Sequence, residues 1–158
     1  MTWQVMDAVR GARDDDLHRS FAIVNKESDM TSTATPHVTP HAIADRYLAT
    51  WNEADDARRQ ALIAALWSPR GRYADPLMSG EGHEGIARMI AAARTQFPGL
   101  VFTARGQADG HGPFARFSWS LGPAGGAPVA GGTDVARLDD GGRVVEVIGF
   151  LDGSAGHA

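Results

Sequence analysis

Cysteine is absent from the sequence, so the protein forms no disulfide bond and has no thiolate for catalysis or metal binding. Disulfides are typical of secreted proteins, and a mildly acidic chain without thiols fits the cytoplasm, where we expect this protein. The chain also lacks the run of about 18 apolar residues that a membrane-spanning helix needs. Near its start, Arg10 and the acidic residues 14–16 stand where a signal peptide would have its apolar centre. We therefore expect neither membrane association nor secretion.

Basic residues are scarce: Lys and Arg number 15 against 19 acidic residues, which gives a net charge of -4. No basic stripe is available to neutralise phosphates, so we expect no nucleic-acid partner. The six histidines and the carboxylates do not follow metal-ligand spacings such as His-x-x-x-His. The glycines near Gly125 and Gly131 fall in a predicted hairpin, whereas a phosphate-binding loop joins a strand to a helix. We therefore expect neither a metal nor another cofactor.

What the sequence does contain is one organised region of domain size. Its 158 residues, 43% of them hydrophobic, suffice for a single buried core. Residues 1–38, which are rich in Ser, Thr and Pro in their second half, are predicted to be a flexible extension with a marginal helix at residues 3–9. Met30 is an alternative start of the chain. The domain itself is predicted over residues 39–152, followed by a short disordered tail at residues 153–158.

Three helices are predicted in the first half of this domain. Thr39 is a good N-cap and Pro40 suits the first helical position, after which apolar residues recur at helical spacing. A second helix is predicted to start after Asp55 and to run to about Leu66, before a Ser-Pro pair that breaks it. A short strand at residues 71–74 and a glycine-rich turn come next. The third helix follows this turn and ends before Pro98.

The second half of the domain changes to a period of two residues, which is typical of strands. Strands are predicted at residues 100–108, 114–121, 129–138 and 143–151, joined by short turns. The second of them alternates most clearly, with an apolar face made of Ala115, Phe117, Trp119 and Leu121. Arg116 lies on its other face, where a salt bridge or a dimer contact is expected. Helices followed by an antiparallel meander predict an α+β fold with the helices on one face of the sheet.

Several short motifs occur in this order and together resemble one superfamily. They are RYLATWN in the first helix, RYADP after the short strand, GHEGI at the third helix, then PGLVF, RFSW, GGTDVARLDDGGRV and GFLD in the strands. Over residues 39–152 the chain resembles the nuclear transport factor 2-like superfamily, in its branch of SnoaL-like polyketide cyclases and ketosteroid isomerases. The resemblance implies an α+β cone-shaped roll, in which three N-terminal helices pack on the concave face of a strongly curved, mainly antiparallel sheet. It further implies an apolar pocket at the open end and a homodimer formed through the sheet.

The resemblance also assigns chemical roles to individual residues. Asp75 matches the general base, Asp134 matches the carboxylic acid that hydrogen-bonds the oxyanion, and Tyr47 matches the tyrosine donor. Apolar surroundings make a carboxylate a stronger base, and a neutral carboxyl beside a phenol can donate hydrogen bonds to an enolate. His83, at the start of the third helix, is a candidate proton shuttle near Asp75.

Apolar side chains of the predicted helices and strands are candidates to line the pocket. We expect a few of them to contact a ligand and most of them to be simple core. The candidates are Trp51, Met78, Met89, Phe97, Phe102, Phe117, Trp119 and Phe150.

The same polar residues also have structural interpretations. Asp75 before a proline is typical of a turn, where its carboxylate bonds nearby backbone. Asp134 shares the inward face of its strand with apolar residues, so it needs a partner such as His83 or Tyr47. Tyr47 can be a core tyrosine with its hydroxyl bonded, and His83 can simply begin its helix.

Three functions therefore remain open. The first is an isomerase or cyclase that acts without a cofactor on a small apolar carbonyl compound, by proton transfer next to the carbonyl. The second is a non-catalytic module that binds small ligands in the same pocket. The third is a dimeric interaction or structural protein, whose pocket is filled by Trp51 and Trp119.

Overall fold

The computed structural model describes residues 38–153 of the chain. The predicted extension, its marginal helix, the alternative start at Met30 and the C-terminal tail lie outside the described residues, apart from Val38 and Gly153. The first predicted helix begins as expected, because the Thr39 side chain accepts a hydrogen bond of 3.1 Å from the backbone N–H of Ala42 and Pro40 is the first helical residue.

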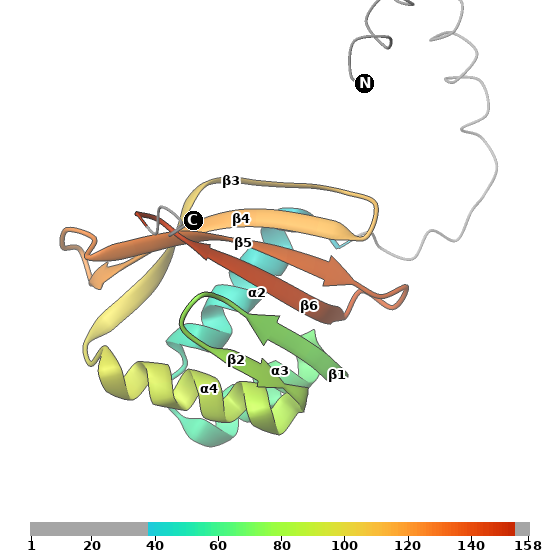
Figure 1. The fold of residues 1–158 in the computed structure, drawn as a ribbon, viewed down its shortest axis with the longest axis horizontal. Coiled ribbons are helices and arrows are strands. Elements are labelled where there is room, and N and C mark those ends of the chain that lie inside the picture. Colours follow the sequence, from blue (N-terminus) through green and yellow to red (C-terminus); the bar gives the residue numbers. More distant parts are fainter. Residues whose placement is uncertain (1–37, 154–158) are drawn as a thin grey trace, which may run out of the picture. The chain divides into compact units, whose positions relative to one another are not determined.

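Three helices lie in the described part of the chain: α2 (Pro40–Asn52), α3 (Asp56–Leu66) and α4 (Gly82–Gln96). Asp55 caps α3 by accepting a hydrogen bond of 2.8 Å from the backbone N–H of Arg58. α2 packs on the far strands of the sheet, β3 and β4, whereas α4 packs on β1 and β2. Figure 1 shows all three helices on the same side of the sheet.

The sheet has six strands in the order β2-β1-β6-β5-β4-β3. Their bounds are β1 (Trp67–Ala74), β2 (Ser79–Glu81), β3 (Leu100–His111), β4 (Phe114–Pro123), β5 (Ala130–Leu138) and β6 (Val144–Leu151). The β1–β6 pair is parallel and the other pairs are antiparallel, so the sheet is mixed but mainly antiparallel. It curves over the helices without closing into a barrel (Figure 1). The predicted α+β roll is confirmed.

The strands differ from the prediction at the start of the sheet. β1 begins at Trp67 rather than at Gly71, although Pro69 lacks a backbone donor. The register of β1 against β6 shifts between Trp67 and Arg72, and this irregularity accommodates the proline. Gly71 is needed there, because a Cβ at this position would lie 2.6 Å from the Trp67 ring. β2 was predicted as part of a turn, and its three residues pair with β1 instead.

The core lies between the helices and the concave face of the sheet. The predicted alternation of β4 is confirmed: Ala115, Phe117, Trp119 and Leu121 are all buried. Arg116 lies on the opposite face and forms a bidentate pair with Asp109, at 3.0 and 2.7 Å. None of the helices between residues 38 and 153 has the length and apolar character that crossing a membrane requires.

Candidate active site

A cavity of about 160 Å³ lies between α2, the end of α4 and the concave face of the sheet. One wall is aromatic: the ring centroids of Trp51 and Phe102 are 5.2 Å apart, and those of Phe102 and Trp119 are also 5.2 Å apart. Gly132 makes room for this wall, because a Cβ there would lie 2.6 Å from the Trp119 ring. The polar groups that line the cavity come from α2, β1, β5 and the residues that directly follow β1 and β6. They are Tyr47, Tyr73, Asp75, Asp134 and Asp152.

Tyr47 and Asp134 form the first polar pair. The Tyr47 hydroxyl donates a hydrogen bond of 2.7 Å to Oδ2 of Asp134. Asp134 is only 1% exposed, and its other oxygen, Oδ1, accepts no hydrogen bond of normal geometry. Burial raises the pKa of Asp134 from 3.8 to about 6. The Tyr47 hydrogen bond and the nearby Trp119 indole act in the opposite direction on this pKa, and the charge of Asp75 adds to the rise. Burial, with the Asp134 charge second, also raises the pKa of Tyr47.

Asp75 and Tyr73 form the second polar pair. Oδ1 of Asp75 accepts hydrogen bonds of 2.7 and 2.8 Å from the backbone N–H groups of Leu77 and Met78. Its Oδ2 accepts a hydrogen bond of 2.6 Å from the Tyr73 hydroxyl. Asp75 is half-buried, whereas Tyr73 is 4% exposed. Asp75 is therefore more accessible than Asp134, the carboxylate of the first pair.

Gly149 of β6 brings the two pairs together. It lies opposite Asp134 in the β5–β6 register. A Cβ on Gly149 would lie 3.0 Å from Oδ1 of Asp134, 3.1 Å from the Cβ of Asp75 and 3.3 Å from the Tyr73 hydroxyl. The carboxylates of β5 and of the β1–β2 connection thus approach each other across a residue that has no side chain.

We expect Gly149→Ala to destabilise the protein by about 1–3 kcal/mol, because the new methyl group overpacks the contact between the two pairs. Urea unfolding measures this loss. Gly85→Ala is the matched control: its Cβ would meet nothing closer than 3.9 Å, and alanine favours the interior of α4. An unchanged unfolding free energy in Gly149→Ala would show that the site has room for the methyl group.

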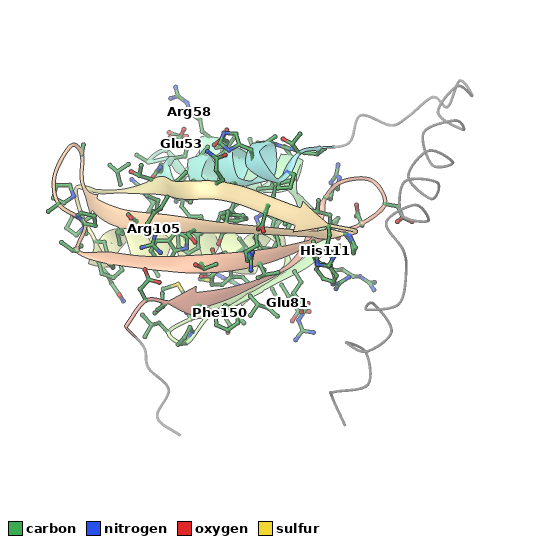
Figure 2. All side chains as sticks on the ribbon, turned by 90° about the horizontal axis from the view of Figure 1, so that it is seen from above. Glu53, Arg58, Glu81, Arg105, His111 and Phe150 are labelled. Atoms are coloured by element: carbon green, nitrogen blue, oxygen red, sulfur yellow. The ribbon has the colours of Figure 1, made fainter. Side chains whose placement is uncertain are left out.

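The structure places the other predicted residues as follows. Met78, Phe97 and the aromatic residues 51, 102 and 119 line the cavity. Phe117 is buried behind it, with its ring centroid 5.0 Å from that of Tyr47. His83 does not line the cavity, and its Nε2 lies 2.9 Å from the backbone oxygen of Trp67. Phe150, which is labelled in Figure 2, is 59% exposed on β6. It also lies outside the cavity lining.

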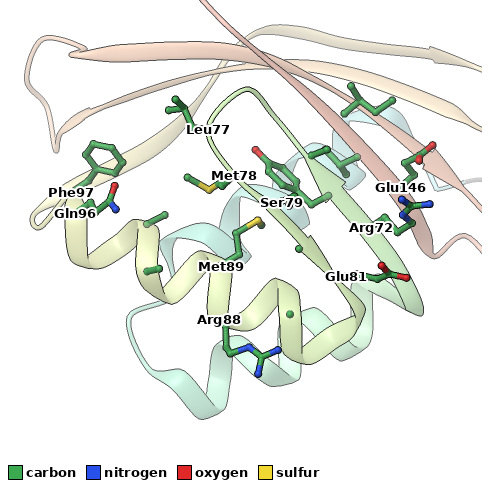
Figure 3. A pocket seen from close by; sticks show the side chains of 18 residues that line it. Arg72, Leu77, Met78, Ser79, Glu81, Arg88, Met89, Gln96, Phe97 and Glu146 are labelled. Carbon is green, nitrogen blue, oxygen red and sulfur yellow. The ribbon is translucent and has the colours of Figure 1, made fainter.

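A second, wider groove of about 1130 Å³ lies between α4 and the strands β1, β2 and β6 (Figure 3). Met89, one of the predicted lining residues, faces this groove rather than the cavity. The groove and the cavity share Tyr73, Leu77, Met78 and Phe97, among other residues. Tyr47 and Asp134 line only the cavity, so the two polar pairs meet there.

Tyr73 and Gly149 were not predicted as site residues. Tyr73 stands two positions before Asp75, and alternate residues of a strand share a face, so strand parity was a usable signal. Gly149 left no such signal, because its role depends on the pairing of β5 with β6. Among residues 38–153, no three His, Asp or Glu side chains lie close enough together to hold a metal ion.

Comparisons with known proteins place this geometry in a family. The model of the SnoaL-like domain matches residues 44–147. A crystal structure described as a putative isomerase of the SnoaL-like family, from Agrobacterium tumefaciens, is 55% identical to the chain; the match covers 72% of this chain and 97% of that one, with a TM-score of 0.69. No curated protein matches the chain significantly.

More distant structures share the fold alone. A putative polyketide cyclase from Sinorhizobium meliloti is 18% identical, with coverages of 68% of this chain and 92% of that one and a TM-score of 0.54. A nuclear transport factor 2-like protein of unknown function from Exiguobacterium is 20% identical, with coverages of 71% and 99% and a TM-score of 0.57. The chain belongs to the SnoaL-like domain family, and its fold is the nuclear transport factor 2-like cone.

Proposed function

We propose that the protein is a cofactor-independent isomerase or cyclase that moves a proton next to the carbonyl group of a small, largely apolar molecule. One observation carries the proposal: two tyrosine–carboxylate pairs, Tyr73–Asp75 and Tyr47–Asp134, line the same apolar cavity. The isomerase and cyclase descriptions of related structures support the reaction class.

In the proposed reaction, Asp75 is the base. Its carboxylate takes a proton from the carbon next to the carbonyl, and the electrons of the broken C–H bond move to the carbonyl oxygen, which forms an enolate. The proton then returns to a different carbon in an isomerisation. In a cyclisation, the enolate carbon instead attacks a second carbonyl of the same molecule, and the proton goes to the new alkoxide.

In this proposal the Tyr47 hydroxyl donates a hydrogen bond to the enolate oxygen, and Asp134 supports Tyr47 through the hydrogen bond between them. Asp134 is too buried to contact a ligand directly through Oδ1. When Asp134 is protonated, its carboxyl group can donate to the Tyr47 oxygen, which leaves the Tyr47 hydrogen free for the ligand. Its pKa of about 6 makes the protonated form accessible at mildly acidic pH.

The cavity limits the size of the reacting group. An engineered cavity of about 150 Å³ holds one benzene molecule, and this cavity measures about 160 Å³. The proposed substrate therefore presents about one six-membered ring to Asp75 and Tyr47. The aromatic wall of Trp51, Phe102 and Trp119 favours an apolar ring.

The proposal is tested by hydrogen exchange of one-ring ketones, beginning with cyclohexanone, in D₂O. Proton NMR would follow the loss of the signal from the hydrogens next to the carbonyl. We expect the wild-type protein to accelerate this loss over buffer and over the same protein after denaturation. If no ketone of the panel exchanges faster with the protein, the proposed reaction is wrong.

One observation favours a second function, a non-catalytic binding module. Asp75 already accepts three hydrogen bonds, two of them from the backbone of its own turn, which is typical of a structural aspartate. A binding module would bind cyclohexanone saturably, with quenching of tryptophan fluorescence from the cavity wall. It would give no exchange above the rate in buffer.

We also propose a homodimer that forms through the outer face of β5 and β6. Ile148 and Phe150 are 45% and 59% exposed there, next to Val135 and Thr133 in the register. Sedimentation equilibrium of Ile148→Ser/Phe150→Ser should show at least about tenfold weaker self-association than the wild type. Val129→Ser removes a similarly exposed apolar side chain, 66% exposed, and serves as the control. A monomeric wild type would refute this proposal.

A further inference from the structure

The carboxylate of Asp75 is held at both of its oxygens. Two backbone N–H groups of the Asp75–Met78 turn occupy Oδ1, at 2.7 and 2.8 Å. These bonds tie Oδ1 to the turn, so Oδ2 is the oxygen that remains for proton chemistry. In the described structure the Tyr73 hydroxyl, at 2.6 Å, is the hydrogen-bond donor to Oδ2. A donor at this distance from a carboxylate forms a strong, charge-assisted hydrogen bond.

Tyr73 is itself rigidly placed. Its side chain is 4% exposed, and its ring centroid lies 5.6 Å from that of Trp51. Its hydroxyl also lies beside Gly149, where a side chain would displace it. Burial, with the charge of Asp134 second and the hydrogen bond to Asp75 third, raises the pKa of Tyr73, so its hydroxyl remains a donor across the physiological range.

We propose that Tyr73 is the positioning residue of the candidate base: its hydroxyl fixes Oδ2 of Asp75 so that the free lone pair of that oxygen faces the cavity. This inference rests on the proposed function of Asp75. It assigns the two tyrosines separate tasks, since Tyr47 serves the ligand oxygen whereas Tyr73 serves the base. A carboxylate held only by its Oδ1 contacts could turn Oδ2 away from the reacting carbon, and small errors of placement are costly in proton transfer.

The first test is the Tyr73→Phe variant in the cyclohexanone exchange assay. We expect kcat to fall about tenfold to a hundredfold, with KM changed less than about twofold, because the ring that lines the cavity is kept while the carboxylate is misplaced. Thr50→Val is the matched control: it removes another buried hydroxyl, which bonds the backbone oxygen of Arg46 outside the cavity, and it should keep wild-type kinetics. In an Asp75→Asn background, Tyr73→Phe should cause no further loss. Wild-type kcat in Tyr73→Phe, or a further loss in the double variant, would overturn the inference.

The second test needs no turnover. A phenolic proton in a short hydrogen bond to a carboxylate resonates far downfield in a proton NMR spectrum. We expect one such signal to disappear in both Tyr73→Phe and Asp75→Asn and to persist in Thr50→Val. If no ketone exchanges with the wild type, the proposed function fails, and this signal still decides whether Tyr73 holds Asp75. Its absence from the wild-type spectrum, or its survival in Asp75→Asn, would refute the inference by itself.

Discussion

We expect Asp75→Asn to lower the rate of cyclohexanone exchange by about a hundredfold to ten-thousandfold, the range that general base catalysis contributes. The amide has no basic lone pair for the proton. Its oxygen can still accept the bonds from the backbone N–H groups of Leu77 and Met78, and its NH₂ group can donate to the Tyr73 oxygen. The fold should therefore survive, and thermal unfolding with circular dichroism would check this.

The control for Asp75→Asn is the same substitution at an exposed carboxylate. Asp140 lies in the turn between β5 and β6, away from the cavity. Asp140→Asn changes the net charge by the same amount and should keep the wild-type exchange rate. If Asp75→Asn also keeps that rate while the wild type exchanges the ketone, the base is another residue and the proposed reaction loses its central step.

The second large effect is expected at Asp134, in the pH dependence of stability. Its pKa rises from 3.8 to about 6 on folding, mainly because the carboxylate is buried. The folded protein therefore binds a proton more tightly than the unfolded chain does. The stabilisation that this tighter proton binding gives the folded state is fully present below pH 3.8 and is lost as the pH rises through about 6. The loss amounts to about 3 kcal/mol of unfolding free energy, at 1.36 kcal/mol per pKa unit.

Asp134→Asn removes this titration and keeps the size of the side chain. The wild type loses stability as Asp134 ionises, whereas the variant does not. From about pH 4 to about pH 7 the unfolding free energy of the variant, minus that of the wild type, should therefore increase by up to about 3 kcal/mol. Urea unfolding at a series of pH values measures the difference, and Asp140→Asn should follow the wild-type curve. Parallel curves for Asp134→Asn and the wild type would mean that Asp134 does not titrate in this window.

The local signals in the sequence were sufficient for most of the fold. Thr39 and Asp55 begin α2 and α3 because their side chains satisfy backbone donors of the first turn, an effect that depends only on neighbouring residues. The alternation of β4 likewise fixed which face is buried. The same parity argument indicated that Asp134 points inward, and it is 1% exposed.

The pairing of distant strands decided the rest. The bulge that lets β1 pass Pro69, and the pairing of β2, depend on which strand lies alongside. The approach of Asp75, Tyr73 and Asp134 around Gly149 depends on the register of β5 with β6 and on the curvature of the sheet. Sequence alone thus determined most of the elements and their buried faces, because these follow from contacts within a few residues. The tertiary structure alone decided the volume of the cavity and the approach of the two tyrosine–carboxylate pairs around Gly149, because these depend on contacts between residues far apart in the chain.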